Sequence, residues 1–188
     1  MGSGKTEAAK YYQRTGYPVL FMDQVGHTCL QKKEIIQSLV DLFGLKILNH
    51  DQTINRKKIS AIVFNNSQKR KRSNGILHPV INQQAKDWIN NHFKQGSHLV
   101  FIEAAILFEM QMNHFLDLTV LIKAAEKDMI ERIKIRDEKS EIAIQKILQT
   151  QKANEDRVDY VLNNDGSLED LYHQCKRLLM ILNEKTIT

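Results

Sequence analysis

The first residues of the chain have the types and spacing of a phosphate-binding loop. Residues 2–6, Gly-Ser-Gly-Lys-Thr, match the second half of the pattern G-x-x-x-x-G-K-[ST], which opens a helix and wraps backbone N–H groups around phosphates. Glycines allow the backbone to approach anionic oxygens closely. Lys5 would place its charge on the β- and γ-phosphates, and the hydroxyl of Thr6 would ligate Mg²⁺. A helix is predicted directly after the loop, and its N-terminal dipole would also favour an anion.

Two features of the full pattern are missing from this stretch. Its first glycine should lie five positions before Gly4, and an apolar strand should lead into the loop, but only three residues precede Gly4. A flexible, tag-like N-terminus is therefore the competing interpretation of residues 2–6. The choice between a phosphate-binding loop and a flexible N-terminus depends on the rest of the sequence.

Carboxylates follow two predicted strands. The apolar run Val19–Met22 ends at Asp23, and the apolar run Leu99–Ile102 ends at Glu103. Open α/β sheets bind ligands at the carboxyl ends of their strands, and a nucleotide site needs an acid near Mg²⁺ there. From its position alone, Asp23 is as well explained as the N-cap of the next helix.

Strands and helices alternate along much of the chain. Further strands are predicted at 118–122 and 159–162. Apolar residues recur at helical spacing in the segments 33–43, 59–64, 79–94, 126–136, 142–151 and 168–182. This alternation predicts an α/β fold with a parallel sheet covered by helices on both faces. Residues 26–94 contain no predicted strand and exceed an ordinary crossover, so we interpret them as an inserted helical subdomain.

The composition is that of a globular protein that favours anionic partners. The 188 residues are 42% hydrophobic and 26% charged, with a net charge of +5. The sequence has no apolar run of about 18 residues, the length that would predict a membrane span. Cys29 and Cys175 lack metal-ligand spacing and are interpreted as free thiols in a reducing cytoplasm rather than as a disulfide.

The densest basic run of the chain is 69–72, Lys-Arg-Lys-Arg. Such a run is most often a solvated helix face. A phosphate-facing patch is the second interpretation, and a nucleic-acid site or import signal the third. No aromatic residues alternate with these charges, as a base-stacking platform would require.

Taken together, these residues resemble the dephospho-CoA kinase family of P-loop kinases over nearly the whole chain. The likeness is carried in order by residues 2–6, the strand ending at Asp23, Ile62-Val63-Phe64, Leu77-His78-Pro79-Val80-Ile81, Leu107-Phe108-Glu109, Glu131-Arg132 through Arg136-Asp137, and residues 159–164. The first motif occurs in many nucleotide-binding proteins, whereas the combination of Leu-His-Pro, Leu-Phe-Glu and Arg-Asp is much more selective. The resemblance implies a P-loop NTPase-like three-layer sandwich with a parallel sheet, a helical CoA-binding insertion and lid helices.

The activity implied by the resemblance is transfer of the γ-phosphoryl group of ATP to the 3′-hydroxyl of dephospho-CoA, the last step of coenzyme A biosynthesis. ATP and Mg²⁺ would be required, in a cytoplasmic monomer or weak oligomer that binds neither nucleic acid nor membrane. The implied parts are a nucleotide-binding core at 1–25, 95–125 and 155–188, a substrate subdomain at 26–94, and a lid region at 126–154.

The resemblance also implies roles for individual residues. Asp23 matches the aspartate that is proposed to accept the hydroxyl proton, and Lys5 and Arg136 complete the catalytic group. The implied ATP-binding residues are Gly2, Ser3, Gly4, Lys5, Thr6, Arg132 and Asn164, with Thr6 as the metal ligand. The implied substrate-binding residues are Asp23, His27, His78 and Glu103. His27 stands where the family often has arginine, which would make one phosphate contact pH-dependent.

In this family, a strand that is absent here lies between the strands represented by Leu99–Ile102 and Leu118–Ile122. Its absence would leave two unpaired edges, and each buried orphan amide or carbonyl costs roughly 1–3 kcal/mol. We therefore expect the natural product to extend upstream by roughly ten residues, a strand and the first glycine. A fragment or an inactive relative is the competing expectation.

Two other functions remain open from the sequence. Another small-molecule P-loop kinase, such as one acting on nucleoside monophosphates, would need a nucleobase pocket. A non-catalytic module that binds nucleotides or nucleic acid through residues 69–72 would bind RNA or DNA in a strongly salt-dependent way.

Overall fold

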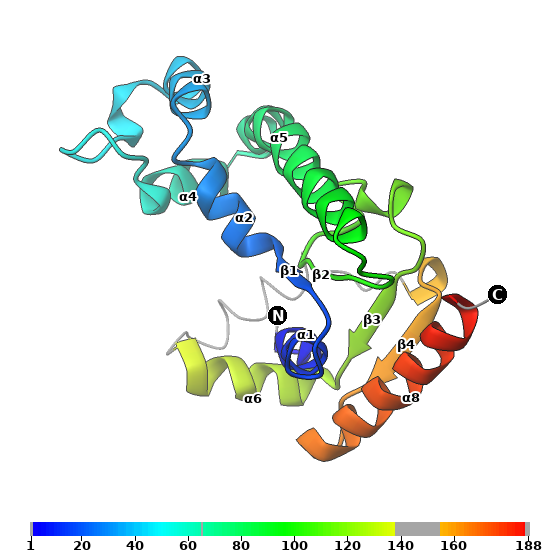
Figure 1. Ribbon diagram of the computed structural model, residues 1–188. Coiled ribbons are helices and arrows are strands. Elements are labelled where there is room, and N and C mark those ends of the chain that lie inside the picture. Colours follow the sequence, from blue (N-terminus) through cyan, green and yellow to red (C-terminus); the bar gives the residue numbers. More distant parts are fainter. Residues whose placement is uncertain (1, 65, 138–154, 187–188) are drawn as a thin grey trace. The chain divides into compact units, whose positions relative to one another are not determined.

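The computed structural model describes residues 2–64, 66–137 and 155–186. Its residues form two compact units (Figure 1). The first unit consists of Met1–Leu20 and Asn91–Thr188, and the second of Phe21–Asn90. The fold is α/β, as the sequence predicts.

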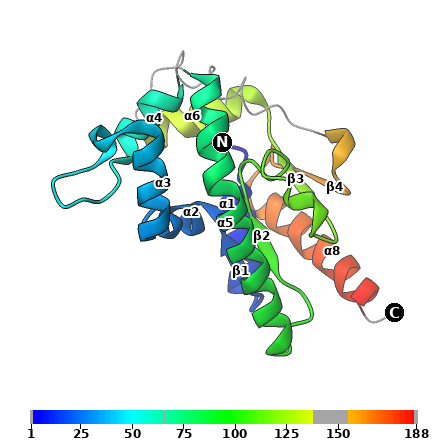
Figure 2. The same ribbon diagram turned by 90° about the horizontal axis from the view of Figure 1, so that it is seen from above.

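The first unit contains the labelled strands, except for the last residue of β1, together with the helices that pack on them. Its elements in chain order are α1 (Lys5–Arg14), β1 (Val19–Phe21, whose last residue belongs to the second unit), β2 (Phe101–Glu103), η2 (Met112–His114), β3 (Val120–Lys123), α6 (Glu126–Asp137), η3 (Glu155–Arg157), β4 (Tyr160–Asn163) and α8 (Leu168–Thr186). Helix α8 runs beside β4 in both views of the ribbon (Figures 1 and 2).

The strands form two separate ladders. Strands β3 and β4 are parallel, with a register that runs from Val120 opposite Tyr160 to Lys123 opposite Asn163. Strand β1 pairs with β2, and within the described residues no ladder joins β2 to β3. Helix α1 packs against both β2 and β3. The gap between the two ladders therefore lies between β2 and β3. By the family resemblance, these are the two strands that should flank a further strand.

The core of the first unit lies between α1, α8 and the β3–β4 ladder. It is built from side chains that are less than a tenth exposed: Ala8, Tyr12, Ile122, Leu162, Leu171, Cys175, Leu178 and Leu182. The α8 members recur at spacings of three and four, the pattern of a helix with one buried stripe. The ring of Tyr12 stacks on that of Phe101 in β2, with centroids 3.9 Å apart. Burial raises the pKa of Tyr12.

The second unit is helical, with α2 (Met22–Cys29), α3 (Lys33–Phe43), η1 (Leu45–Ile47), α4 (Arg56–Phe64) and most of α5 (Ser67–Lys94). Helix α3 has the predicted limits and ends at Gly44, whose φ of 84° favours glycine. Helix α2 packs against α5 where Gly26 meets Ile81; a Cβ at Gly26 would lie 3.9 Å from Cδ1 of Ile81.

Several predicted boundaries were wrong. Strands β2 and β3 each begin two residues later than predicted, at Phe101 and Val120. Helix α5 begins at Ser67 and runs through Pro79, rather than beginning near Pro79. The missed signal is Asn66, whose Oδ1 accepts a hydrogen bond from the N–H of Lys69 at 2.9 Å, an N-cap contact. A proline inside a helix removes one backbone hydrogen bond, and the rest of the long helix tolerates that loss. Strand β1 ends at Phe21, so Asp23 lies in the first turn of α2.

The basic run 69–72 occupies the start of α5, where Arg70, Lys71 and Arg72 are exposed. This exposure is compatible with a solvated helix face, and the choice between that interpretation and a phosphate-facing patch stays a prediction. In the part of the chain that the structure describes, no helix combines the length and apolar character that crossing a membrane requires.

Candidate functional site

The loop at residues 2–4 passes directly into α1. Gly2 and Gly4 have φ values of 77° and 94°, which residues with a Cβ rarely adopt. Gly4 is the N-cap of α1, its carbonyl accepts a hydrogen bond from the N–H of Ala8 at 3.0 Å, and no side chain caps this helix. The first-turn N–H groups of α1 have no partner within the helix and suit an anion.

The ammonium of Lys5 forms an ion pair with the carboxylate of Glu103 at the end of β2. Glu103 is 7% exposed, so its charge is buried beside the loop. A buried carboxylate needs such a partner, because an unpaired buried charge is strongly destabilising. The structure thus brings together two residues that the sequence predicts for one site, 98 positions apart.

Two polar side chains hold the backbone of the loop. Asn164 follows β4, is 6% exposed, and donates from Nδ2 to the carbonyl of Ser3 at 2.8 Å. Arg132 of α6 donates to the carbonyl of Asn164 at 3.1 Å and to that of Gly2 at 3.4 Å. Sequence reasoning assigned both side chains to ATP and missed these contacts, since their acceptors are backbone atoms that leave no sequence signal.

Both loop glycines lie in tight surroundings. A Cβ at Gly2 would lie 2.8 Å from the carbonyl oxygen of Met129 in α6. A Cβ at Gly4 would lie 2.2 Å from Nδ2 of Asn164. These distances are shorter than any van der Waals contact, so the absence of a side chain is required at both positions for packing as well as for torsion angles.

Three residues predicted to bind substrate lie in the second unit. Asp23 and His27 are exposed and one turn apart on α2, and His78 is half-buried on α5. Their approach to the loop stays a prediction. The side chain of Arg136 and residues 138–154, which include most of the predicted lid, lie outside the described residues.

Two side chains near the loop could supply oxygen ligands to a metal ion. Thr6, in the first turn of α1, is exposed, and Glu103 supplies a carboxylate. The described residues include no cluster of three His, Cys, Asp or Glu side chains that would form a metal cage. A hydroxyl and a carboxylate are oxygen ligands of the kind that Mg²⁺ takes, together with waters and substrate phosphates.

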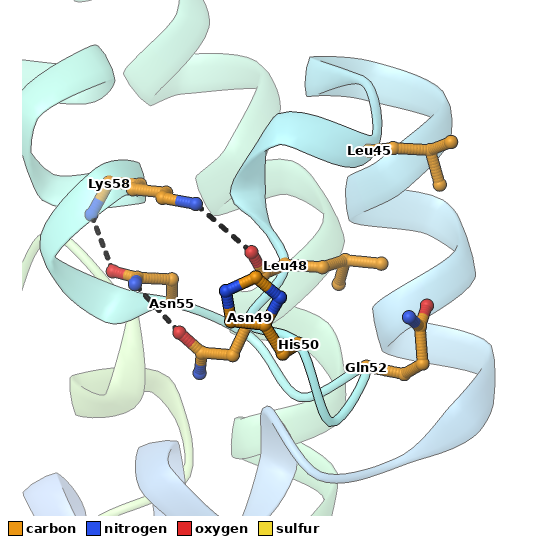
Figure 3. Close-up of a pocket in the computed structure, with 7 residues that line it drawn as sticks. All are labelled: Leu45, Leu48, Asn49, His50, Gln52, Asn55 and Lys58. Atoms are coloured by element: carbon orange, nitrogen blue, oxygen red, sulfur yellow. Dashed lines mark hydrogen bonds between the residues drawn. The ribbon is translucent and has the colours of Figure 1, made fainter.

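A separate hollow of about 400 Å³ lies in the second unit, between η1 and the start of α4 (Figure 3). Its polar groups bond to one another. Nζ of Lys58 donates to the carbonyl of Leu48 at 3.1 Å, and Nδ2 of Asn55 donates to Oδ1 of Asn49 at 2.7 Å. These bonds brace the turn, so we place no part of the site there.

The chain is similar to known proteins over most of its length. The family model of dephospho-CoA kinase matches residues 1–170. The dephospho-CoA kinase of Fusobacterium nucleatum is 30% identical over 180 residues, covering 94% of this chain and 92% of that protein. The enzyme of the same name from Dehalococcoides mccartyi is 31% identical over 182 residues, covering 95% of this chain and 91% of the relative.

Solved structures show the same fold. A crystal structure of a Thermus thermophilus protein matches with a TM-score of 0.82 and 28% identity, covering 97% of this chain and 93% of that one. Dephospho-CoA kinase from Campylobacter jejuni matches with a TM-score of 0.72 and 23% identity, covering 98% and 94%. These structures support a P-loop NTPase-like fold, and the family model with the named relatives shows that the protein is a kinase. The chain belongs to the dephospho-CoA kinase family.

Proposed function

We propose that this chain transfers the γ-phosphoryl group of ATP to the 3′-hydroxyl of dephospho-CoA, completing coenzyme A. Membership of the family supports the reaction. The observation that carries the site assignment is the ion pair between Lys5 and Glu103, at the point where the loop enters α1. It places the cation that a phosphate loop requires next to an acid at a strand end.

In this proposal the ATP phosphates lie on the N–H groups of the loop and of the first turn of α1. Lys5 then contacts the β- and γ-phosphates in place of Glu103. Arg136 adds positive charge near the transferring group, where it stabilises the transition state. Arg132 acts through the loop backbone that it holds. Thr6 and Glu103 would hold Mg²⁺, which when bound neutralises phosphate charge.

The acceptor side of the reaction is assigned to the second unit. Asp23 orients the 3′-hydroxyl and accepts its proton, and His27 and His78 bind the substrate. The charge of this unit supports the assignment, since 11 Lys and Arg stand against 5 Asp and Glu in residues 21–90 while the net charge of the whole chain is only +5. An anionic substrate is attracted to such a surface.

The predicted parts of the enzyme are retained in the proposal: a core at 1–25, 95–125 and 155–188, a CoA subdomain at 26–94 and a lid at 126–154. We place the enzyme in the cytoplasm as a monomer or weak oligomer that does not bind nucleic acid. Both cysteines, Cys29 and Cys175, are free and buried, which suits a reducing compartment. Light scattering and a salt-dependent RNA-binding assay would test the oligomeric state and the nucleic-acid statement.

A coupled ADP-release assay tests the function. Dephospho-CoA with ATP and Mg²⁺ should give turnover, and a panel of nucleoside monophosphates should give none. Asp23→Asn should lower kcat by about 10²- to 10⁴-fold, the usual range for a general base. Full turnover of this variant would refute the role of Asp23, and turnover with a nucleoside monophosphate alone would refute the substrate assignment.

A further inference from the structure

We propose that Asn164, assisted by Arg132, is the positioning residue that turns the phosphate loop toward ATP. The inference rests on the proposed role of residues 2–6 as the ATP-binding loop. In this proposal Asn164 does not contact the nucleotide. Instead, it holds the carbonyl groups of the loop on the side away from the phosphates.

Asn164 is anchored to the sheet before it reaches the loop. Its backbone N–H donates to the carbonyl of Lys123, the last residue of β3, at 2.7 Å. Its side chain then donates from Nδ2 to the carbonyl of Ser3 at 2.8 Å. The loop is therefore tied to the end of the β3–β4 ladder by a buried side chain whose own backbone is fixed.

A hydrogen bond to a loop carbonyl also fixes the direction of the N–H group of the next residue. In a planar trans peptide, the C=O and the N–H of the next residue point in opposite directions. Because the carbonyl of Ser3 is bound by Asn164, the N–H of Gly4 points away from Asn164. In the same way, the contact from Arg132 to the carbonyl of Gly2 at 3.4 Å directs the N–H of Ser3 away from Arg132. Two N–H groups are thereby presented to an anion.

The two tying side chains also support each other. The guanidinium of Arg132 donates to the carbonyl of Asn164 at 3.1 Å, so α6, the Asn164 turn and the loop form one hydrogen-bonded group. The close approach of Nδ2 to Gly4 leaves no space between the turn and the loop. A carboxylate at position 164 would lack the donor and would face a carbonyl oxygen, which is repulsive.

The test measures ATP affinity by calorimetry without dephospho-CoA, and then both KM values. We expect Asn164→Ala to weaken ATP binding by about tenfold, the factor that one hydrogen bond contributes. Asn164→Asp should weaken it further, by about 100-fold, because it adds charge repulsion. The KM for ATP should rise in both variants, whereas the KM for dephospho-CoA at saturating ATP should stay within twofold.

Asn163→Asp is the matched control, since Asn163 is the exposed neighbour at the end of β4. It should leave ATP affinity unchanged. Wild-type affinity in both Asn164 variants, or an equal loss in the control, would overturn the proposal. So would a rise in both KM values together, which indicates general loss of structure.

Arg132→Met keeps the test decisive if an Asn164 variant does not fold. It removes the second hydrogen-bond donor from the same loop and should also raise only the KM for ATP. Wild-type protein that binds ATP without phosphorylating dephospho-CoA would refute the proposed function, and the affinities of the variants would still decide the role of Asn164. Wild-type protein that does not bind ATP would refute both.

Discussion

Lys5 and Glu103 neutralise each other at the point where α1 starts and β2 ends. The lysine is about one third exposed, whereas the carboxylate is buried. An ATP phosphate that approaches the loop therefore meets a lysine that already has an anionic partner. In the proposed reaction, the carboxylate would exchange Lys5 for Mg²⁺ when the phosphate takes its place.

This relationship predicts opposite effects of Glu103→Gln on binding and on turnover. Without Mg²⁺, the variant should bind ATP several-fold more tightly, because Lys5 has no competing carboxylate. With Mg²⁺, kcat should fall by at least tenfold. Calorimetry in EDTA and the ADP-release assay measure the two effects. Glu155→Gln, which removes an exposed ion pair with Lys123, is the control and should change neither. Weaker binding of ATP by Glu103→Gln in EDTA would contradict the exchange.

Gly4→Ala and Gly16→Ala form a second matched pair. Both glycines have a φ of 94° and both variants pay roughly 1–2 kcal/mol for a left-handed residue with a Cβ. A Cβ at Gly16 meets nothing within 4 Å, whereas one at Gly4 displaces the side chain of Asn164. We expect similar falls in the free energy of unfolding from the torsion cost, with a further fall and loss of ATP binding only in Gly4→Ala. Chemical denaturation would measure the free energies of unfolding, and calorimetry would measure ATP binding. Tight ATP binding by Gly4→Ala would rule out the clash with Asn164.

Helix α8 begins with a reciprocal cap that makes stability depend on acid. Oγ and N–H of Ser167 donate to the Asp170 carboxylate at 2.8 and 2.9 Å, and the N–H of Asp170 donates to Oγ of Ser167 at 3.2 Å. These bonds hold the pKa of Asp170 below its ordinary value, with the side-chain bond the larger cause.

The sign of the pH effect follows from that direction. A carboxylate with a lowered folded-state pKa stabilises the protein above its unfolded pKa, and the stabilisation is lost as pH falls through the folded value. Ser167→Ala should therefore lower the free energy of unfolding near neutral pH, because it removes the cap, and lower it less in acid. Denaturation series at several pH values would measure it. An equal cost at every pH would show that Asp170 does not take part.

The two buried thiols report on the two units separately. Cys29 is fully buried in the second unit and Cys175 in the first, and burial raises the pKa of both. Both should resist an aromatic disulfide reagent in the native protein and react on unfolding, because the thiolate is the reacting form. Mass spectrometry after pulse labelling in denaturant would assign each thiol. Fast labelling of either one in native buffer would contradict its burial.

Much of the fold could be predicted from the sequence, because it follows from periodicity. The limits of α3 follow from its apolar spacing and from Gly44. The strands β3 and β4 follow from two apolar runs, and the α/β alternation predicts their parallel direction, whereas their pairing was not predicted. The start of α5 was missed because Pro79 was given more weight than the Asn66 cap. Residue types alone predicted that Lys5 and Glu103 share a site. The ties to Ser3 could not be predicted, since a backbone carbonyl is the same in every residue.

The stacked rings of Tyr12 and Phe101 carry a consequence for the loop. Tyr12 lies two turns after Lys5 on α1, and Phe101 lies two residues before Glu103 on β2, so helix and strand touch at two places along their length. One contact is aromatic and the other is ionic. If an ATP phosphate takes Lys5 from Glu103, as we propose, the aromatic contact does not depend on that charge and would keep α1 aligned with β2.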